Sequence, residues 1–138
     1  MKLNPYNIFV DTNVLIGAFS DKQQDKKCLD YLFSLKGKYL FISTLSVAQL
    51  VSVFQKRKTN KVIKDIVRSL IAKFTIIEFS ETDIENSLNY DYSDMEDSIQ
   101  YIISKKKKCA YFVTNNKKDY ISFNLNVLLP QQVRSINQ

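Results

Sequence analysis

Short apolar runs alternate with segments of helical periodicity along all 138 residues of the chain. Each run is continuously apolar rather than alternating between apolar and polar residues, which is typical of strands covered on both faces. This order favours an α/β fold with a parallel sheet between two layers of helices. The runs predict strands at Asn7–Val10, Tyr39–Ile42, Thr75–Phe79, Ala110–Thr114 and Val127–Leu129.

The segments between these runs carry apolar residues three and four positions apart, which is the spacing of one helix face. We expect Ser43 or Thr44 to cap the third helix and Asn60 the fourth, because short polar side chains accept hydrogen bonds from first-turn amides. Ser93 and Glu96 have the spacing of a capping box at the last helix. The predicted helices are Thr12–Phe19, Lys22–Leu35, a helix containing Val47–Phe54, Asn60–Lys73, Thr82–Leu88 and Ser93–Lys107.

The chain contains no histidine and only two cysteines, Cys28 and Cys109, which lie far apart in the sequence. Catalytic triads of Ser, His and Asp, histidine general bases and structural zinc sites are therefore excluded. Any chemistry has to come from carboxylates, a metal ion, Lys, Tyr or hydroxyl groups. Because the chain has no linker and no repeat, we expect residues 1–138 to form a single domain.

The chain carries twenty Lys and Arg residues against fourteen Asp and Glu residues, which gives a net charge of +6. This charge suits a polyanionic partner such as RNA or DNA, although many other soluble proteins are mildly basic. The first residues contain no long apolar stretch, so we expect no signal peptide, and no run approaches the roughly 20 apolar residues that a membrane helix needs. Because free cysteines are typical of a reducing compartment, we expect a cytoplasmic protein with no membrane partner.

Polar residues follow the predicted strands at the points where the strands end. These residues are candidates for an active site, because open parallel sheets place their sites outside the carboxyl ends of the strands. A hard cation such as Mg²⁺ takes oxygen ligands, activates water and stabilises charge during displacement at phosphorus. The candidates are Asp11 and Asn13 after the first strand, Ser43 after the second, Thr114, Asn116 and Asp119 after the fourth, and Asp94 and Asp97 at the start of the last helix.

Each of these acids also has a purely structural interpretation. Asp11 suits a turn between a strand and a helix. Asp94 and Asp97 lie in a first helical turn, where the helix dipole favours acids, and their shared face is either solvated or part of a cleft. Glu96 is already explained by capping, so we expect no catalytic role for it.

The order of these motifs resembles that of the PIN-domain nucleases, in particular the VapC-type toxins of type II toxin–antitoxin pairs. Asp11–Asn13 read DTN after an apolar strand, Asp94–Asp97 read DMED at the start of a helix, and Phe112–Tyr120 read FVTNNKKDY. In the family the last two blocks read much like DFEDA and VTRNKKDF. The resemblance covers nearly the whole chain, from Ile8 to about Leu129.

The resemblance implies a three-layer α/β/α sandwich with a five-stranded parallel sheet. It also implies an endoribonuclease that depends on Mg²⁺ or Mn²⁺ and, as a toxin, is held silent by a protein antitoxin. Dimers are common among PIN domains, so we expect a homodimer. Matched by position, the catalytic group is Asp11, Asp97, Asp94 and Asn116, of which Asp11 and Asp97 are the main metal-binding acids and Asp94 is a neighbouring metal-site acid. The supporting group is Asn13, which orients Asp11, with the strand-end hydroxyl of Ser43, Thr114 and the peripheral acid Asp119.

Position 49 departs from the family pattern, in which the helix after the second strand usually carries a Glu. Gln49 keeps an oxygen ligand but loses the negative charge, so it is a poorer ligand for a hard cation. Our hypothesis is that Asp11, Asp94 and Asp97 still hold one metal ion, with Gln49 as a neutral ligand or a water anchor. The rival interpretation is that this copy has lost its activity.

Basic residues near the predicted site are candidates for contacts with RNA phosphates. Lys117 and Lys118 lie beside the site and would give salt-dependent, largely sequence-independent binding. The run Lys105–Lys108 is expected at the opposite edge of the sheet, where it favours a helix C-terminus. Tyr101 and Tyr120 have the chemistry for stacking on bases, although packing in the protein is the expectation for each.

Two other functions remain open on the sequence alone. A catalytically weak or inactive PIN module that binds nucleic acid or a protein partner is favoured by Gln49 and disfavoured by the intact acids. A phosphatase-like or receiver-type domain is disfavoured, because receiver domains usually carry paired acids early in the chain and no such pair stands near Asp11.

Overall fold

The structure is a computed structural model, and it describes residues 2–90, 94–120 and 125–137. The strands in these ranges are β1 (Asn4–Val10), β2 (Tyr39–Ser43), β3 (Thr75–Ile77), β4 (Cys109–Val113) and β5 (Asn126–Leu128). The helices are α1 (Thr12–Ala18), α2 (Gln23–Ser34), α3 (Thr44–Phe54), α4 (Asn60–Lys73), α5 (Glu81–Ser87) and α6 (Met95–Lys106), with 3₁₀ helices at Lys117–Asp119 and Pro130–Ser135.

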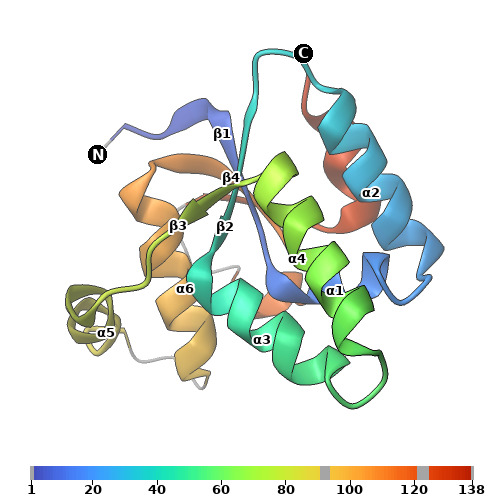
Figure 1. The fold of residues 1–138 in the computed structure, drawn as a ribbon. Coiled ribbons are helices and arrows are strands. Elements are labelled where there is room, and N and C mark those ends of the chain that lie inside the picture. The colour runs from blue at the N-terminus through green and yellow to red at the C-terminus, as the bar shows by residue number, and fades with distance from the viewer. Residues whose placement is uncertain (1, 91–93, 121–124, 138) are drawn as a thin grey trace.

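The strands form one parallel sheet in the order β3-β2-β1-β4-β5, with β1 at its centre (Figure 1). Phe9 of β1 pairs with Phe41 of β2 on one side and with Phe112 of β4 on the other. Helices cover both faces, so the predicted three-layer α/β/α fold with a five-stranded parallel sheet is confirmed. Since all the strands run the same way, their carboxyl ends meet at one edge.

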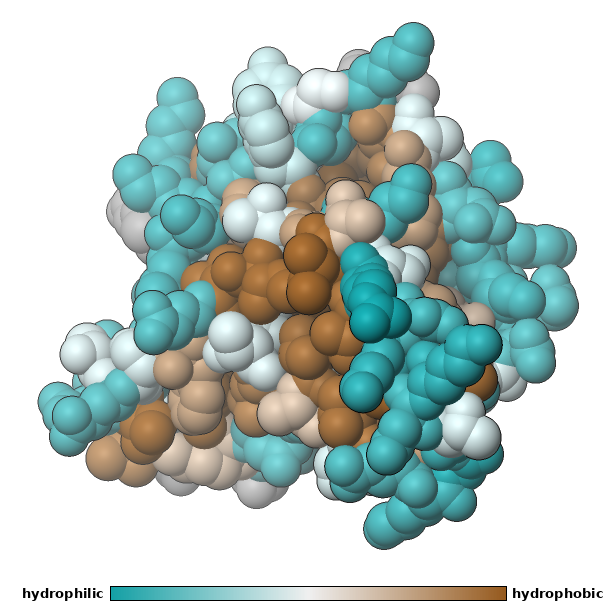
Figure 2. Space-filling view, in the orientation of Figure 1, coloured by the Kyte–Doolittle hydropathy of each residue, from teal (hydrophilic) through white to brown (hydrophobic). Residues whose placement is uncertain are grey.

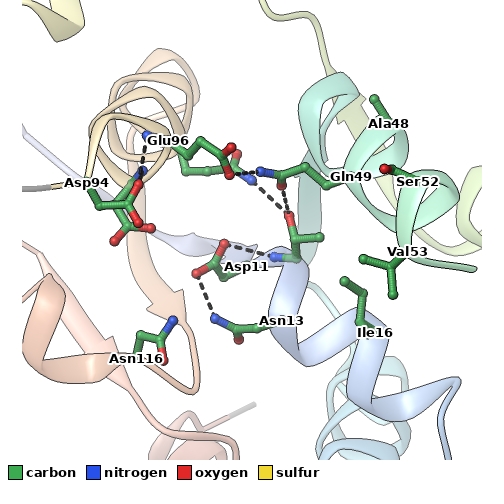
Figure 3. Close-up of a pocket in the computed structure, with 13 residues that line it drawn as sticks. Asp11, Asn13, Ile16, Ala48, Gln49, Ser52, Val53, Asp94, Glu96 and Asn116 are labelled. Carbon is green, nitrogen blue, oxygen red and sulfur yellow. Dashed lines mark hydrogen bonds between the residues drawn. The ribbon is translucent and has the colours of Figure 1, made fainter.

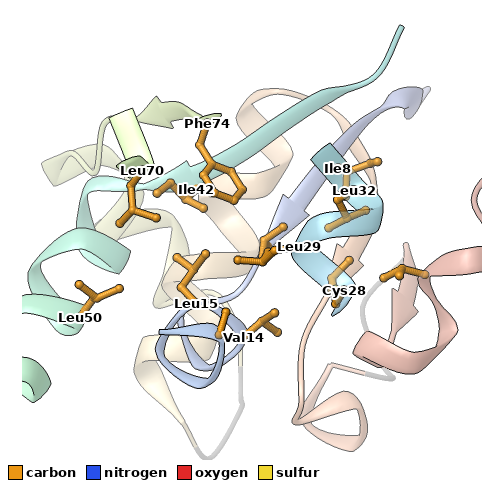
Figure 4. Close-up of a cluster of buried hydrophobic side chains, with 14 of the residues drawn as sticks. Ile8, Val14, Leu15, Cys28, Leu29, Leu32, Ile42, Leu50, Leu70 and Phe74 are labelled. Atoms are coloured by element: carbon orange, nitrogen blue, oxygen red, sulfur yellow. The ribbon is translucent and has the colours of Figure 1, made fainter. Parts of the chain in front are cut away.

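The larger hydrophobic core lies on the face of the sheet covered by α1, α2, α3 and α4 (Figure 4). Ile8 and Val10 of β1 and Ile42 of β2 face this core, and Leu29 of α2 and Leu70 of α4 pack against them. Burial of such aliphatic side chains supplies most of the driving force for packing helices on the sheet, at roughly 1.5–3 kcal/mol for each side chain.

A second core lies on the opposite face, under α6. Residue Phe9, between Ile8 and Val10 in the strand, points to this face because successive strand residues alternate. Its ring stacks on Phe112 at 5.1 Å between centroids, and Phe112 contacts the ring of Tyr120 at 4.4 Å. Tyr120 therefore packs in the core, as expected, and it is fully buried.

Several predicted boundaries were wrong by one or two residues. Strand β3 ends at Ile77 rather than Phe79, because its partner β2 ends at Ser43, which pairs with Ile77. Helix α4 is capped by Thr59 instead of Asn60, since the backbone at Thr59 is extended and its side chain accepts a hydrogen bond from the Val62 amide.

The starts of α3, α5 and α6 differ in how they are capped. Ser43 caps α3, which is one of the two predicted alternatives. A capping box of Ser80 and Asp83 starts α5 one residue before the predicted Thr82. The predicted cap Ser93 lies outside the described residues, and the N-cap of α6 is Asp94. In the described ranges, no helix is both long and apolar enough to cross a bilayer.

Asp83 anchors α5 to α6 and gives a prediction about acid stability. Its carboxylate accepts hydrogen bonds from the Ser80 amide at 2.8 Å and from Lys106 Nζ at 3.0 Å. Burial raises the pKa of Asp83, but these donors outweigh it and hold the pKa below the ordinary value of 3.8. A carboxyl with a lowered pKa stabilises the fold above its unfolded-state pKa, and this contribution is lost as the pH falls through the folded pKa.

Asp83→Asn should therefore lower the free energy of unfolding at pH 7 by about 1–3 kcal/mol. The difference from the unmodified chain should shrink below pH ~4, where the native carboxyl is protonated as well. Urea denaturation at pH 7 and pH 3 measures both values, with exposed Glu85→Gln on the same helix as the control. An equal loss at both pH values would contradict a charged role for Asp83.

Candidate active site

A cavity of about 540 Å³ opens at the carboxyl edge of the sheet, between α3 and α6 (Figure 3). All four residues predicted as catalytic line it: Asp11, Asp94, Asp97 and Asn116. Asn13 and Gln49 line it as well, and so does Glu96, for which no catalytic role was expected. The structure thus gathers residues from the end of β1, from α1, from α3, from the start of α6 and from the segment after β4 around one cavity.

Asp11 is buried, and hydrogen bonds fix the orientation of both its carboxylate oxygens. Its Oδ1 accepts from the Thr12 amide at 2.8 Å, which makes Asp11 the N-cap of α1. Its Oδ2 accepts from Thr114 Oγ1 at 2.9 Å and from Asn13 Nδ2 at 3.2 Å. Burial raises the pKa of Asp11, and the hydrogen bonds from Thr114, Thr12 and Tyr120 offset this only in part.

Asn13 and Thr114 tie the end of β1 to the end of β4. Asn13 donates from Nδ2 to Thr114 Oγ1 at 3.1 Å, and its Oδ1 accepts from the Asn115 amide at 2.9 Å. Thr114 Oγ1 also accepts from the Asn116 amide at 3.0 Å. These bonds hold Asp11 and the backbone of Asn116 at fixed positions beyond the carboxyl ends of the neighbouring strands β1 and β4.

Asp97 lies in the first turn of α6, and its carboxylate contacts the same hydroxyl group, that of Tyr120, as the carboxylate of Asp11. Tyr120 Oη is 2.8 Å from Asp97 Oδ1 and 3.2 Å from Asp11 Oδ2, so the two carboxylates lie on two sides of the same atom. Burial raises the pKa of Asp97 to about 6, assisted by the nearby carboxylates of Asp94, Asp11 and Asp119. Burial and the two acids raise the pKa of Tyr120 as well, so it stays a neutral phenol.

Tyr120→Phe removes only this hydroxyl and should lower the free energy of unfolding by about 1.5–3 kcal/mol, as expected for a hydrogen bond to a charged group. Tyr31→Phe is the matched control, because Tyr31 Oη donates at 2.8 Å to the neutral carbonyl of Ile136. That loss should be smaller, about 0.5–1.5 kcal/mol. Urea denaturation of both variants at pH 8 makes the comparison, and a loss for Tyr120→Phe no larger than for Tyr31→Phe would contradict it.

Gln49 joins α1 to α6 across the cavity. Its Oε1 accepts from Thr12 Oγ1 at 2.6 Å, and its Nε2 donates to Glu96 Oε2 at 2.5 Å. The Asp94 carboxylate caps α6 by accepting from the amides of Glu96 and Asp97, and the predicted contact of Glu96 with Ser93 lies outside the described residues. The Glu96 carboxylate is instead turned toward the cavity.

A buried network lies behind Gln49, and its central residue, Gln100, was not predicted. Gln100 Oε1 accepts from Ser43 Oγ at 2.7 Å, and Gln100 Nε2 donates to Thr12 Oγ1 and to Ser46 Oγ, each at 3.0 Å. Ser43 is fully buried and does not line the cavity, so its place is structural support. The available signal was a polar residue one turn after Glu96 in an otherwise apolar stretch of α6.

Lys117, Lys118 and Asp119 lie at the rim, in the 3₁₀ helix that follows Asn116. None of the three lines the cavity. Lys117 Nζ donates to Gln132 Oε1 at 3.1 Å, and the side chain of Lys118 is exposed. Asp119 is close enough to raise the pKa of Asp97, which is an indirect effect on the site.

The oxygen donors of the cavity fit a hard divalent cation. In the described parts of the chain, no three acidic, histidine or cysteine side chains stand close enough together to hold an ion. Mg²⁺ does not need three, because it is usually bound through one or two carboxylates and keeps several waters. Asp11 and Asp97, on two sides of one hydroxyl, provide such a pair, so these residues fit the group that the family implies.

Comparison with known proteins agrees with this architecture. The structure resembles that of a toxin–antitoxin complex from Klebsiella pneumoniae, with a TM-score of 0.69 and 23% identity over 89% of this chain and 97% of that one. It also resembles FitAcB from Neisseria gonorrhoeae, with a TM-score of 0.67 and 19% identity over 89% and 97% of the chains. Mycobacterium tuberculosis VapC20, a sarcin-ricin loop cleaving toxin, has a TM-score of 0.67 and 10% identity over 84% and 95%.

No curated protein matches the chain in sequence. The family model of the PIN domain, however, matches residues 7–118, which is most of the chain and includes Asp11, Asp97 and Asn116. The resemblance seen in the motifs is therefore confirmed, and the chain belongs to the PIN-domain family.

Proposed function

We propose that this protein is a divalent-metal-dependent endoribonuclease and the toxin of a toxin–antitoxin pair. The observation that carries the proposal is the pair of acids Asp11 and Asp97, which contact one buried hydroxyl and line a cavity at the carboxyl edge of a PIN-domain sheet. The similar structure of VapC20 is that of a toxin that cleaves the sarcin-ricin loop, which supports RNA as the substrate class.

Asp11 and Asp97 would hold the cation, which is expected to be Mg²⁺ or Mn²⁺. When bound, such an ion lowers the pKa of a coordinated water and offsets charge at a phosphate. Thr114, Asn13 and the Thr12 amide keep Asp11 in one orientation, so little reorganisation is needed when substrate arrives.

The remaining residues of the proposed site act on the substrate or on the acids. Tyr120 fixes one oxygen of Asp97 and leaves the other for the cavity. Asn116 lines the cavity and can donate its amide hydrogens to a phosphate oxygen. Lys117 and Lys118, at the rim, would bind neighbouring phosphates and make affinity fall with salt. Asp94 adds a further negative charge beside Asp97.

A second candidate function is a catalytically weak PIN module that binds nucleic acid or a protein partner. Gln49 favours it, because the amide at this position brings no negative charge to the cavity. The two functions differ in a single respect that can be measured, which is whether the folded protein cleaves RNA when a divalent ion is supplied.

We infer in addition that the chain binds a protein antitoxin and forms a homodimer in the cytoplasm. Two of the similar structures are described as a toxin–antitoxin complex and as FitAB bound to a DNA fragment. An apolar surface over α3, bordered by hydrophilic side chains, is visible in Figure 2. A groove of about 410 Å³ between α3 and α4 is lined by Val51, Ile63 and Val67 together with Lys64 and Arg68, so it suits an apolar partner segment with acidic residues.

The proposed nuclease activity is tested by incubating the purified chain with a mixed RNA pool in Mn²⁺ or Mg²⁺, with EDTA in a parallel reaction. We expect cleavage that stops when EDTA removes the ion. Absence of cleavage by a protein that is folded and binds Mn²⁺ would contradict the nuclease and favour the silent binding module. Cleavage that continues in EDTA would contradict the metal dependence.

A further inference from the structure

We propose that Glu96 supplies the acid that the cavity lacks at position 49, and that Gln49 is the residue that positions it. This inference rests on the proposed metal-dependent function and deepens it. It moves one acid of the site from α3, where the family usually carries a Glu, to the first turn of α6. Figure 3 shows Glu96 reaching from α6 toward Gln49 on α3, above Asp11.

The hydrogen bonds that lead to Glu96 all run in one direction. The Ser46 amide donates to Ser43 Oγ, so the Ser43 hydroxyl is free to donate onward to Gln100 Oε1. Gln100 Nε2 donates to Thr12 Oγ1, which then gives its single proton to Gln49 Oε1. Gln49 therefore presents Nε2 to the cavity, where it donates to Glu96.

The Glu96 end of this relay fixes its direction. An ionised carboxylate can only accept hydrogen bonds, so the group of Gln49 that faces Glu96 has to be the NH₂ group. Gln49 is thus held with its carbonyl oxygen turned to Thr12 and its NH₂ group turned to the cavity. An NH₂ group cannot coordinate a cation, but it can hold a carboxylate that does. Gln49 as a direct neutral ligand, which the sequence left open, does not agree with this geometry.

The adjacent acids Glu96 and Asp97 in the first turn of α6 point to different sides of the cavity. Asp97 points to Tyr120 and Asp11, on the β4 side of the cavity. Glu96 lies on the same helix face as Gln100, one turn away, and points to the α3 side. The cavity is therefore lined by acids on two sides, although its α3 side has no acid of its own.

Gln49 also restricts the conformations of the Glu96 side chain. The Glu96 residue is exposed, so its side chain would sample several rotamers in water if nothing held it. Its contact with Gln49, which is itself anchored in the buried network, selects the rotamer that faces the cavity. Gln49 acts through Glu96, so its substitution should change metal affinity without removing any charge.

The test is the affinity for Mn²⁺, measured by isothermal titration calorimetry on folded protein. Glu96→Gln should weaken Mn²⁺ binding about tenfold or more, and Gln49→Leu, which keeps every carboxylate, about tenfold. The double variant Gln49→Glu with Glu96→Gln exchanges the two groups and keeps a donor–acceptor pair at the contact. It should bind Mn²⁺ nearly as tightly as the unmodified chain, because the acid is restored on the α3 side.

Circular dichroism of each variant shows that it is folded before binding is compared, and Asp97→Asn serves as the reference for a lost metal acid. If Glu96→Gln and Gln49→Leu bind Mn²⁺ as the unmodified chain does while Asp97→Asn does not, the inference is wrong and the proposed function stands. If the unmodified chain binds no Mn²⁺, the proposed function fails and the inference fails with it.

Discussion

Asp97→Asn is expected to reduce RNA cleavage about a thousandfold or more, which corresponds to roughly 4 kcal/mol of transition-state stabilisation. Asn has the size of Asp, and its carbonyl oxygen can still accept the hydrogen bond that Tyr120 Oη makes at 2.8 Å. The substitution removes only the negative charge. The site then keeps one of the two carboxylates that contact the Tyr120 hydroxyl. Single-turnover cleavage of a defined RNA, in Mn²⁺, measures the loss.

The same variant should be at least as stable as the unmodified chain at pH 8. The pKa of Asp97 is raised to about 6, so its stabilising contribution is present at low pH and is lost as the pH rises through 6. At pH 8 the Asp97 carboxylate is ionised, and its charge destabilises the folded state. The neutral Asn side chain removes this charge. Asp30→Asn, at an exposed position on α2, is the matched control. It should change neither the rate of RNA cleavage nor the free energy of unfolding. Unchanged cleavage by Asp97→Asn would mean that the site lies elsewhere.

Phe112→Ala is expected to lower the free energy of unfolding by about 3–5 kcal/mol, the largest stability effect of any change considered for this protein. Phe112 is fully buried on β4, where its ring stacks on Phe9 and contacts Tyr120. Removing it leaves a cavity in the core under α6 and takes away the surface against which Tyr120 packs. Equilibrium denaturation in urea measures the change.

The size of the Phe112 effect should depend on burial and not on aromatic character alone. Phe33→Ala is the comparison, because Phe33 is an aromatic residue at the surface, 36% exposed, whose ring meets Phe74 edge to face. The loss for Phe33→Ala should be clearly smaller, because about a third of the Phe33 side chain stays in contact with water in the folded protein. Equal losses in the two variants would show that the second core contributes far less than its packing indicates.

The strands and helices of this fold could be predicted because each leaves a local pattern in the sequence. Continuous apolar runs such as Asn7–Val10 lie within observed strands, and the i, i+3, i+4 spacing placed the helices to within a few residues. The order β3-β2-β1-β4-β5 was not predicted, because strand pairing joins residues as distant as Phe9 and Phe112. The end of β3 depends on where its partner ends, which is also a non-local fact.

In the candidate site, too, residues with a local sequence pattern could be predicted, and residues placed by long-range contacts could not. Asp11, Asp97 and Asn116 could be located from strand ends and a helix start, and the structure places all three around one cavity. Tyr120 and Glu96 could not, because their contacts span 109 positions to Asp11 and 47 to Gln49. Their roles follow from which side chains meet in space, and a local pattern carries no information about that.

The most direct test of the central claim is a crystal structure of the chain grown with Mn²⁺, with anomalous scattering measured at the manganese absorption edge. We expect an anomalous peak in the cavity, at bonding distance from oxygens of Asp11 and Asp97. A structure at saturating Mn²⁺ with no peak in the cavity, and with Tyr120 still between the two acids, would contradict it.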